Sequence, residues 1–449
     1  MISKLVSSRV KSLRAHLENH PGFQKAVANM GWLLANEFLR MGIGLCVGVW
    51  LARYLGPAQF GMLSYALAFV GLFSVLVGLG LDGIVVRDLV NHPDGGNEIL
   101  GSAFMLQLFG GSLAFMAVIA ISRVMHPKES HLRWVIGIIA FGLIFQSSKS
   151  IDLWFQSQVK SKYTVISEIT SFIVLSLTKV ILILRGASLV FFALAYLFQV
   201  IEIMISQIFF YHRSGKSVFL WEPSVQCAKR LLAEAWPLII SGFAIMIYMK
   251  IDQIMLLEMS GENAAGIYAA AVRLSEVWYF IPTVIASSVF PSLVKSKKAG
   301  GKTYLTRLQS YFDLSALLAY GLAIPFSLFA PFILNTLYGS AYQGADRIFA
   351  IHIWAGLFVF LGISRGQYLV NEGLLKFSFF STAIGAVINM VLNFILIPKY
   401  AGVGAAIATV AAHGVSAYLS SFFFRPALQC AYMQTLALFS PIRYVLRVI

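Results

Sequence analysis

Charged side chains and cysteines are both scarce in this chain of 449 residues. Only 12% of the residues are charged, whereas 59% are hydrophobic, and the mean hydropathy is +0.79. This composition excludes an ordinary soluble globular protein and predicts a protein that crosses a membrane many times. The apolar runs are long and continuous, which argues against a transmembrane β-barrel, whose strands are short and alternate in hydropathy.

The three cysteines, Cys46, Cys227 and Cys430, are widely separated and form neither a disulfide framework nor a metal-binding set. No P-loop and no HExxH spacing occurs, which argues against direct coupling to ATP and against a zinc hydrolase. We therefore expect no enzyme activity, no cofactor and no resident metal. The net charge of +15 is explained by basic loops that face anionic lipid headgroups, so we expect no nucleic-acid partner.

Twelve apolar stretches are long enough to cross a bilayer, since about 20 apolar residues suffice for a helix. They lie near residues 31–52, 60–81, 99–122, 132–154, 164–184, 187–210, 236–257, 268–294, 311–334, 348–370, 374–396 and 402–424. We predict an all-α polytopic membrane protein with two lobes of six helices each. Because each half has an even number of helices, their pseudo-two-fold axis should run along the membrane normal.

The predicted organisation has five parts. They are an interfacial N-terminal segment (1–25), an N-lobe (26–210), a cytoplasmic connection (211–235), a C-lobe (236–424) and an interfacial C-terminal tail (425–449). The tails and the even-numbered loops carry about three times as many Lys and Arg residues as the odd-numbered loops. This bias predicts that both termini are cytoplasmic.

The two halves resemble each other faintly in sequence. Gly56–Gly61 follows the first apolar stretch, and Gly261–Gly266 follows the seventh. Each segment begins and ends with glycine and comes directly after an apolar run. This similarity indicates an internal repeat.

Six basic residues lie in the middle of apolar stretches. They are Arg40, Lys149, Lys179, Lys250, Arg273 and Arg365. A cation near the bilayer centre costs about 2.5–3.5 kcal/mol on insertion scales, and such residues usually line a cavity or a transport pathway. The sequence therefore predicts a transporter with a cationic cavity for an anionic cargo.

Three of these cations have a carboxylate three residues away, on the same helix face. The pairs are Glu37 with Arg40, Lys149 with Asp152, and Arg273 with Glu276. Such pairs either lower the cost of burying each charge or form a network in which a bound anion competes for the cation. The residues considered for ion coupling or charge pairing, by proton or sodium, are Glu37, Asp152, Glu202, Asp252 and Glu276.

Several segments resemble the bacterial polysaccharide flippases, which export O-antigen repeat units and belong to the multidrug/oligosaccharidyl-lipid/polysaccharide exporter superfamily. The segments are Leu51–Gly61 (LARYLGPAQFG), Gly80–Asp82, Val86–Asp88, Asp252–Leu256, Gly266–Leu274, Phe280–Pro282 and Phe290–Pro291. The similarity covers nearly the whole chain. The arginine set of the related peptidoglycan-precursor flippases has no residue-by-residue match here, which argues against lipid II as cargo.

The resemblance implies a flippase of the bacterial inner membrane that works by alternating access. Its cargo would be an undecaprenyl-pyrophosphate-linked oligosaccharide, moved from the cytoplasmic to the periplasmic leaflet. A polysaccharide polymerase and a chain-length regulator would be its partners, together with membrane lipids. Two alternatives stay open: a multidrug or cation antiporter of the same fold, and a membrane-embedded enzyme of glycan assembly.

Overall fold

The computed structural model describes the backbone of residues 21–299 and 301–443, and the side chains from Arg40 onward except those at 298, 299 and 302. Most of the predicted N-terminal segment and the Glu37 side chain lie outside this description. The chain divides into two compact units, residues 1–46 and 47–449. Every described element is an α-helix or a 3-10 helix, which confirms the predicted fold class.

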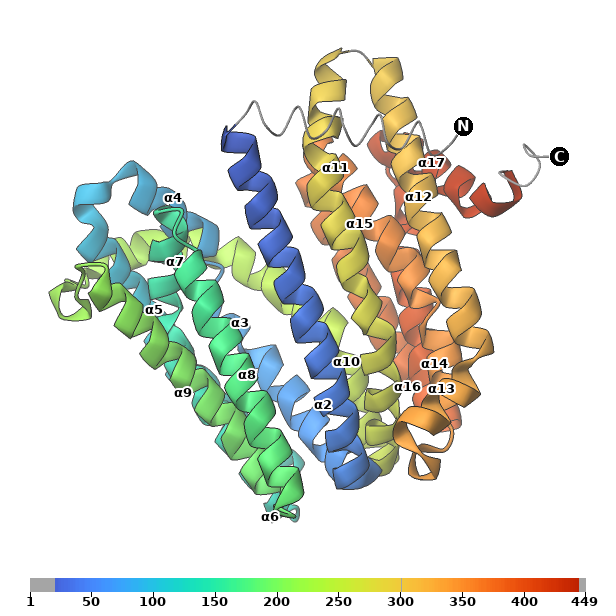
Figure 1. Cartoon of the computed structure of the whole chain (residues 1–449), viewed down its shortest axis with the longest axis horizontal. Helices are drawn as coiled ribbons and strands as arrows, with labels where there is room; N and C mark the ends of the chain where they lie inside the picture. The colour runs from blue at the N-terminus through green and yellow to red at the C-terminus, as the bar shows by residue number, and fades with distance from the viewer. Residues whose placement is uncertain (1–20, 300, 444–449) are drawn as a thin grey trace. The chain divides into compact units, whose positions relative to one another are not determined.

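The helices follow one another with short connections (Figure 1). In the first half they are α2 (Pro21–Phe73), α3 (Val75–Gly78), α4 (Asp82–Asn91), α5 (Gly96–Met125), α6 (Ser130–Phe145), α7 (Lys149–Ser157), α8 (Lys162–Leu184) and α9 (Leu189–Arg213). In the second half they are α10 (Val225–Glu276), α11 (Phe280–Ala299), α12 (Gly301–Leu328), α13 (Ala330–Tyr338), α14 (Ala345–His352), α15 (Ala355–Glu372), α16 (Leu375–Ala417) and α17 (Leu428–Leu438).

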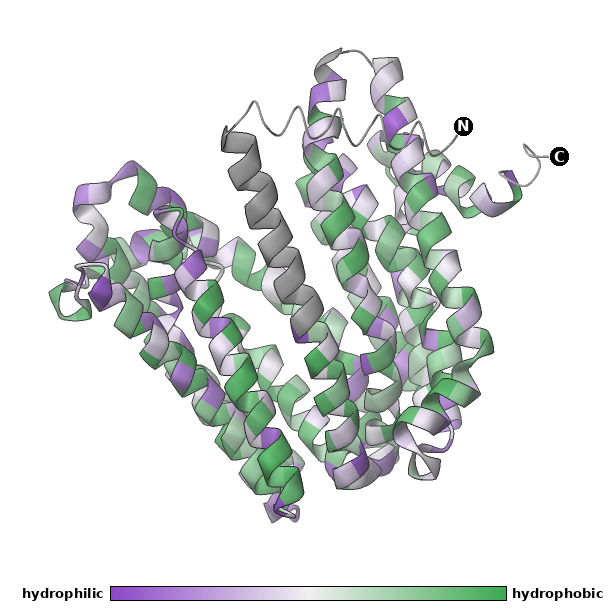
Figure 2. Ribbon diagram, viewed as in Figure 1, coloured by the Kyte–Doolittle hydropathy of each residue, from purple (hydrophilic) through white to green (hydrophobic). Residues whose placement is uncertain are grey.

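Nine helical runs in the described chain are long and apolar enough to cross a membrane. Figure 2 shows hydrophobic residues along most of the length of these helices. Three of the runs contain a residue with non-helical backbone angles, at Gly56, Gly261 and Ala401, where two helices meet. Dividing these three runs at their kinks gives the twelve membrane passes expected from the sequence.

The kinks of α2 and α10 are repeats of one another. Gly56 has φ 70° and ψ 170°, and Gly261 has φ 82° and ψ 176°. A φ in this range is favourable for glycine alone, because a side chain would collide with the backbone. The internal similarity noticed in the sequence therefore marks two equivalent turns, one in each half.

These two turns pack against each other reciprocally. A Cβ atom on Gly61 would lie 2.1 Å from the carbonyl oxygen of Glu262, and one on Gly266 would lie 1.8 Å from that of Pro57. In one contact a glycine of the first half faces a carbonyl of the second half, and in the other contact the roles are reversed. This reciprocity is typical of a two-fold symmetric interface. Each glycine allows one backbone to approach the other more closely than any side chain would permit.

Each half has its own hydrophobic core. The first core includes Cys227, Leu231 and Ala235 from the start of α10, so part of the predicted connection between lobes packs within the first half. The second core includes Cys430 and Met433 of α17. One face of the predicted C-terminal tail is therefore buried against α12.

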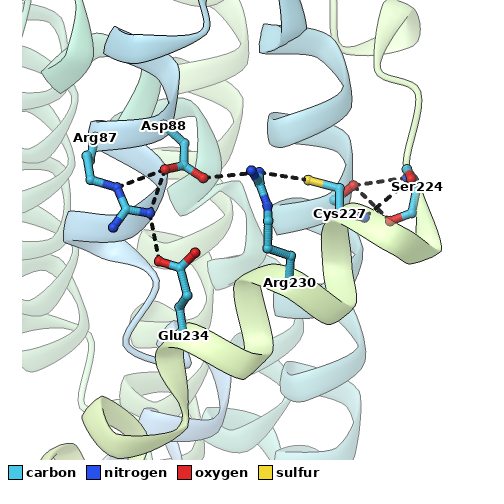
Figure 3. Close-up of polar contacts among 7 residues, drawn as sticks. Arg87, Asp88, Ser224, Cys227, Arg230 and Glu234 are labelled. Carbon is cyan, nitrogen blue, oxygen red and sulfur yellow. Dashed lines mark hydrogen bonds and ion pairs between the residues drawn. The ribbon is translucent and has the colours of Figure 1, made fainter.

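A charged network fastens the start of α10 to α4 (Figure 3). The buried Asp88 carboxylate pairs with Arg87 at 2.7 Å and with Arg230 at 3.1 Å. Arg87 also pairs with Glu234 at 2.7 Å. Two cations on one buried carboxylate satisfy its charge, and the link from Arg87 to Glu234 joins α4 to α10 a second time.

Replacing Gly266 by alanine should weaken the contact between the two turns, because the new methyl group would overlap the Pro57 carbonyl. Overpacking of this kind costs about 1–3 kcal/mol. We expect a lower apparent unfolding temperature of the purified protein in detergent. Gly71→Ala is the matched control, since a Cβ at that position meets no atom within 4 Å. Equal unfolding temperatures for the two variants would contradict the reciprocal contact.

Candidate functional site

A cavity of about 620 Å³ lies between the second half of α2 and the helices of the C-lobe. The α2 residues that line it are Phe60, Ser64, Leu67 and Ala68. The rest of the lining comes from α10, α14, α15, α16 and the 3-10 turn Val277–Tyr279. Charged, hydroxyl, imidazole and aromatic groups share the lining, as is typical of a ligand site.

Two of the six predicted cavity cations, Lys250 and Arg273, line this cavity. Lys250 makes no hydrogen bond or ion pair with any residue that the structure describes. The Arg273 guanidinium lies against α2, because a Cβ atom on Gly48 would come within 2.5 Å of its Cζ. Gly48 therefore leaves the space that this guanidinium occupies.

Lys179, the third predicted cation, does not line this cavity. It lies on α8, is buried and donates a hydrogen bond of 3.0 Å to the Tyr196 hydroxyl on α9. Its ammonium also lies 4.2 Å from the centre of the Tyr196 ring. These contacts join α8 to α9.

Lys149 and Arg365 do not line the cavity in the described part of the chain. Lys149 forms an ion pair of 2.6 Å with Asp82 instead of pairing with Asp152, and both partners are about half exposed. The Asp152 carboxylate accepts a hydrogen bond from Gln156. This charge pair ties α7 to α4, so the spacing of three residues predicted the wrong partner.

Arg365 is 5% exposed and lies within the C-lobe. It donates hydrogen bonds to Ser420 at 2.9 Å, to Ser421 at 3.3 Å and to Ser381 at 3.0 Å. Three neutral hydroxyls thus solvate the guanidinium, which offsets part of the cost of its burial. Its contacts join α15, α16 and the 3-10 turn Leu419–Phe423.

Two further predicted residues remain. Glu202 on α9 does not line the cavity, and one of its carboxylate oxygens is buried without a hydrogen-bond partner among the described atoms. Arg40 lies on α2 within the unit Met1–Cys46, whereas the cavity belongs to the unit 47–449.

Both predicted carboxylates of α10, Asp252 and Glu276, line the cavity. Asp252 is buried and accepts hydrogen bonds from three side chains: Tyr268, at 3.0 Å, Asn393 and Thr409. The Asn393 amide also donates to Asn389 at 3.1 Å, one helical turn away. A carboxylate, two amides and two hydroxyls therefore form one oxygen-rich cluster beside the cavity.

The sequence interpretation missed the polar partners of this site. Tyr248 hydrogen-bonds His413, and Ser275 hydrogen-bonds His352, with both histidines on the cavity lining. The pair Asn389 and Asn393 could have indicated this site from the sequence. Two amides four residues apart in an apolar run must find hydrogen-bond partners within the protein.

A model of the family described as "Polysaccharide biosynthesis protein" matches residues 26–297 of this chain. This match covers more than half of the sequence. The chain belongs to the polysaccharide biosynthesis protein family. The resemblance noted in the sequence is therefore confirmed.

A probable low-salt glycan biosynthesis flippase, Agl15 of Haloferax volcanii, is 25% identical to this family member over 416 residues. The similarity spans 87% of the chain and 82% of Agl15. Among solved structures, an inward-facing MATE family transporter of the MOP superfamily matches with a TM-score of 0.73 at 15% identity, over 88% of this chain and 96% of its own. The lipid II flippase MurJ in an inward closed conformation matches with a TM-score of 0.69 at 15% identity, over 92% of both chains. These two matches show that the chain has the fold of these transporters.

A second polar cluster joins the two halves beside the reciprocal turns. The buried Tyr65 of α2 donates a hydrogen bond of 2.6 Å to Glu258 of α10. His126, which follows α5, lies 2.8 Å from the Tyr65 hydroxyl and 3.1 Å from the Glu258 carboxylate. Its other ring nitrogen lies 3.2 Å from Glu129. The imidazole thus bridges two carboxylates, one from each half.

The hydrogen bond with Glu258 raises the pKa of His126 above its ordinary value, against the lowering effect of burial. Since the pKa is raised in the assembled state, the charged contact is fully present below about pH 6.5. It is lost as the pH rises through the raised pKa. Alkaline pH should therefore loosen the contact between Glu258 and the first half.

This pH dependence can be measured with a cysteine in place of Ser64, in a background without native cysteines. We expect a membrane-impermeant maleimide, added on the side of residues 126–129, to label it faster as the pH rises from about 6 to about 9. In the His126→Gln variant, which has no titrating group at this position, labelling should be faster at about pH 6. At each pH, the labelling rate of the protein with His126 is divided by that of the His126→Gln variant. This ratio removes the pH dependence of the thiol itself. A ratio that does not change with pH would show that His126 does not hold this contact.

Proposed function

We propose that this protein is a flippase for a lipid-linked oligosaccharide that bears a pyrophosphate. In its specific form, the cargo is an undecaprenyl-pyrophosphate-linked repeat unit of O-antigen or a similar surface polysaccharide. The cargo moves from the cytoplasmic to the periplasmic leaflet of a bacterial inner membrane, with both termini of the protein in the cytoplasm. A polymerase and a chain-length regulator would then use the exported unit.

The observation that carries this proposal is that Lys250 and Arg273 share one cavity with hydroxyl, imidazole and amide groups, beside the carboxylates of Asp252 and Glu276. Lysine serves as a point charge for phosphate, and arginine can bind it through two hydrogen bonds. Tyr248, Tyr279 and His413 offer aromatic faces and polar atoms to the sugar rings. The family match and the name of the Haloferax relative support the same class of cargo.

A second candidate function is export of a cationic drug in exchange for an ion. The observation that favours it is Glu276, an exposed carboxylate on the cavity lining. Lys250 opposes it, because a cation without an ion pair in the described structure repels a cationic ligand.

Deletion of the gene in its own host separates these functions. A membrane-impermeant probe on spheroplasts should find that the lipid-linked unit accumulates on the cytoplasmic face and that the wild-type gene relieves this. Normal arrival at the outer face with unpolymerised glycan would instead indicate an enzyme. Sensitivity to cationic dyes without a glycan defect would indicate the antiporter.

Replacing Lys250 by glutamine should reduce export of the glycan while the protein stays in the membrane at its normal level. A hydrogen bond to a charged group is worth about 1.5–3 kcal/mol, so the rate at low cargo concentration should fall by about tenfold or more. The matched control is Lys295→Gln, since Lys295 is exposed and does not line the cavity. Equal loss in both variants, or in neither, would contradict the cargo site.

The Asp252 cluster is the site that we propose for the coupling ion, a proton or sodium. Unwound helix segments and side-chain oxygens supply such sites in transporters. Asn393 is fully buried, and its amide oxygen has no hydrogen-bond partner among the described atoms. This oxygen belongs to the same buried cluster as the Asp252 carboxylate, so the two residues together can supply oxygen ligands to a proton or a sodium ion.

The Asp252→Asn variant should therefore lose the dependence of export on an ion gradient, because its side chain is neutral at every pH. Export is measured in vesicles with an imposed sodium gradient and, separately, with an imposed pH gradient. Asp152→Asn is the control, since Asp152 lies apart from the cluster and accepts from Gln156. An Asp252→Asn variant that still responds to the same gradient as the wild type would overturn the coupling site.

A further inference from the structure

A groove outside the candidate site runs along the pair of helices α5 and α6. It has a volume of about 700 Å³ and is lined mainly by apolar side chains of α5, α6 and α9. Phe115 of α5 and Phe141 of α6 meet edge to face in its wall, with ring centres 5.7 Å apart. Gly137 widens the groove, since a Cβ there would approach Ile119 to 3.4 Å.

The helices around this groove face lipid. Trp134 on its lining is 69% exposed, and the neighbouring Met116 is 59% exposed. Exposed tryptophan is typical of the level of the headgroups, where its ring is apolar and its N–H is polar. The groove therefore extends from the headgroup region into the hydrocarbon region of the bilayer.

Two arginines lie at the headgroup end of the groove. Arg123 belongs to the last turn of α5, and Arg133 to the start of α6. Neither guanidinium group has a hydrogen bond or an ion pair with a described residue. The nearby Glu129 is engaged by His126 at 3.2 Å. A cation at the N-terminal end of a helix is opposed by the helix dipole, so Arg133 gains from an anion at this place.

We propose that this groove binds an anionic phospholipid of the surrounding bilayer. The phosphate lies between Arg123 and Arg133, and an acyl chain lies along Phe115, Ile119 and Phe141. Guanidinium groups match phosphate oxygens through paired hydrogen bonds, and the apolar wall accepts the chain. This site is separate from the cavity with Lys250 and does not depend on the proposed cargo.

A second groove on the same helices provides a comparison within the molecule. It has a volume of about 470 Å³ and is lined by residues of α5, α6, α7 and α9, of the turn Gln146–Ser148 and of the segment from Val218 to Pro223. None of the described residues that line it is charged. It offers an apolar channel without a phosphate site, and we expect it to bind lipid without selecting the headgroup.

The test is native mass spectrometry of the full-length protein with added phosphatidylglycerol or phosphatidylcholine of identical chains. We expect the wild type to retain phosphatidylglycerol preferentially. Each basic residue contributes about 1 kcal/mol to attraction of an anionic lipid, so Arg123→Gln with Arg133→Gln should lower this retention by about tenfold or more. Arg185→Gln with Arg347→Gln removes the same charge from exposed positions that do not line the groove, and should leave retention unchanged.

A further variant, Gly137→Leu, keeps both arginines and fills the groove. It should also lose phosphatidylglycerol, and it keeps the test decisive if the double variant does not fold. Three outcomes would overturn the proposal. They are equal retention of the two lipids by the wild type, unchanged retention in the Gly137→Leu variant, and recovery of a polyprenyl phosphate instead of a phospholipid from the purified protein.

Discussion

The rest of the structure depends on a close approach of two backbones, where Gly61 faces the Glu262 carbonyl and Gly266 faces the Pro57 carbonyl. A side chain at either glycine would collide with the facing carbonyl oxygen and push the two halves apart. The approach places the second half of α2 beside the C-lobe, and this forms one wall of the cavity. Transport by alternating access would require this contact to open and close. Because glycines have no side chains, no interlocked side chains would have to rearrange when it does.

Several charged groups in the described helices are satisfied by different kinds of partner. Arg365 is solvated by three serine hydroxyls, Lys179 by a tyrosine, and Asp88 by two arginines. These groups hold helices together, since their partners come from neighbouring helices. Lys250 differs, because it lies on a cavity and forms no ion pair with a described residue. The absence of a protein partner is what distinguishes a cation available to a ligand from one that stabilises the fold.

The predicted fold agrees closely with the structure. The twelve apolar stretches, the equivalent turns at Gly56 and Gly261, and the two lobes all follow from local sequence, because a helix in a bilayer must be apolar over its whole length. The site was predicted less well. Lys250 and Arg273 were expected on a cavity and lie there, whereas Lys149 and Arg365 were expected there and lie elsewhere.

The sequence by itself determined that the chain crosses the membrane many times, that it has two related halves, and to which family it belongs. These properties depend on composition, on short motifs and on the period of a single helix. The tertiary structure decided which buried charges meet a partner and which face the cavity, and it brought Asn393 and Thr409 to Asp252 over more than 140 residues. The reason is that an intramembrane charge has the same cost wherever it lies in the sequence, while its partner depends on how the helices pack.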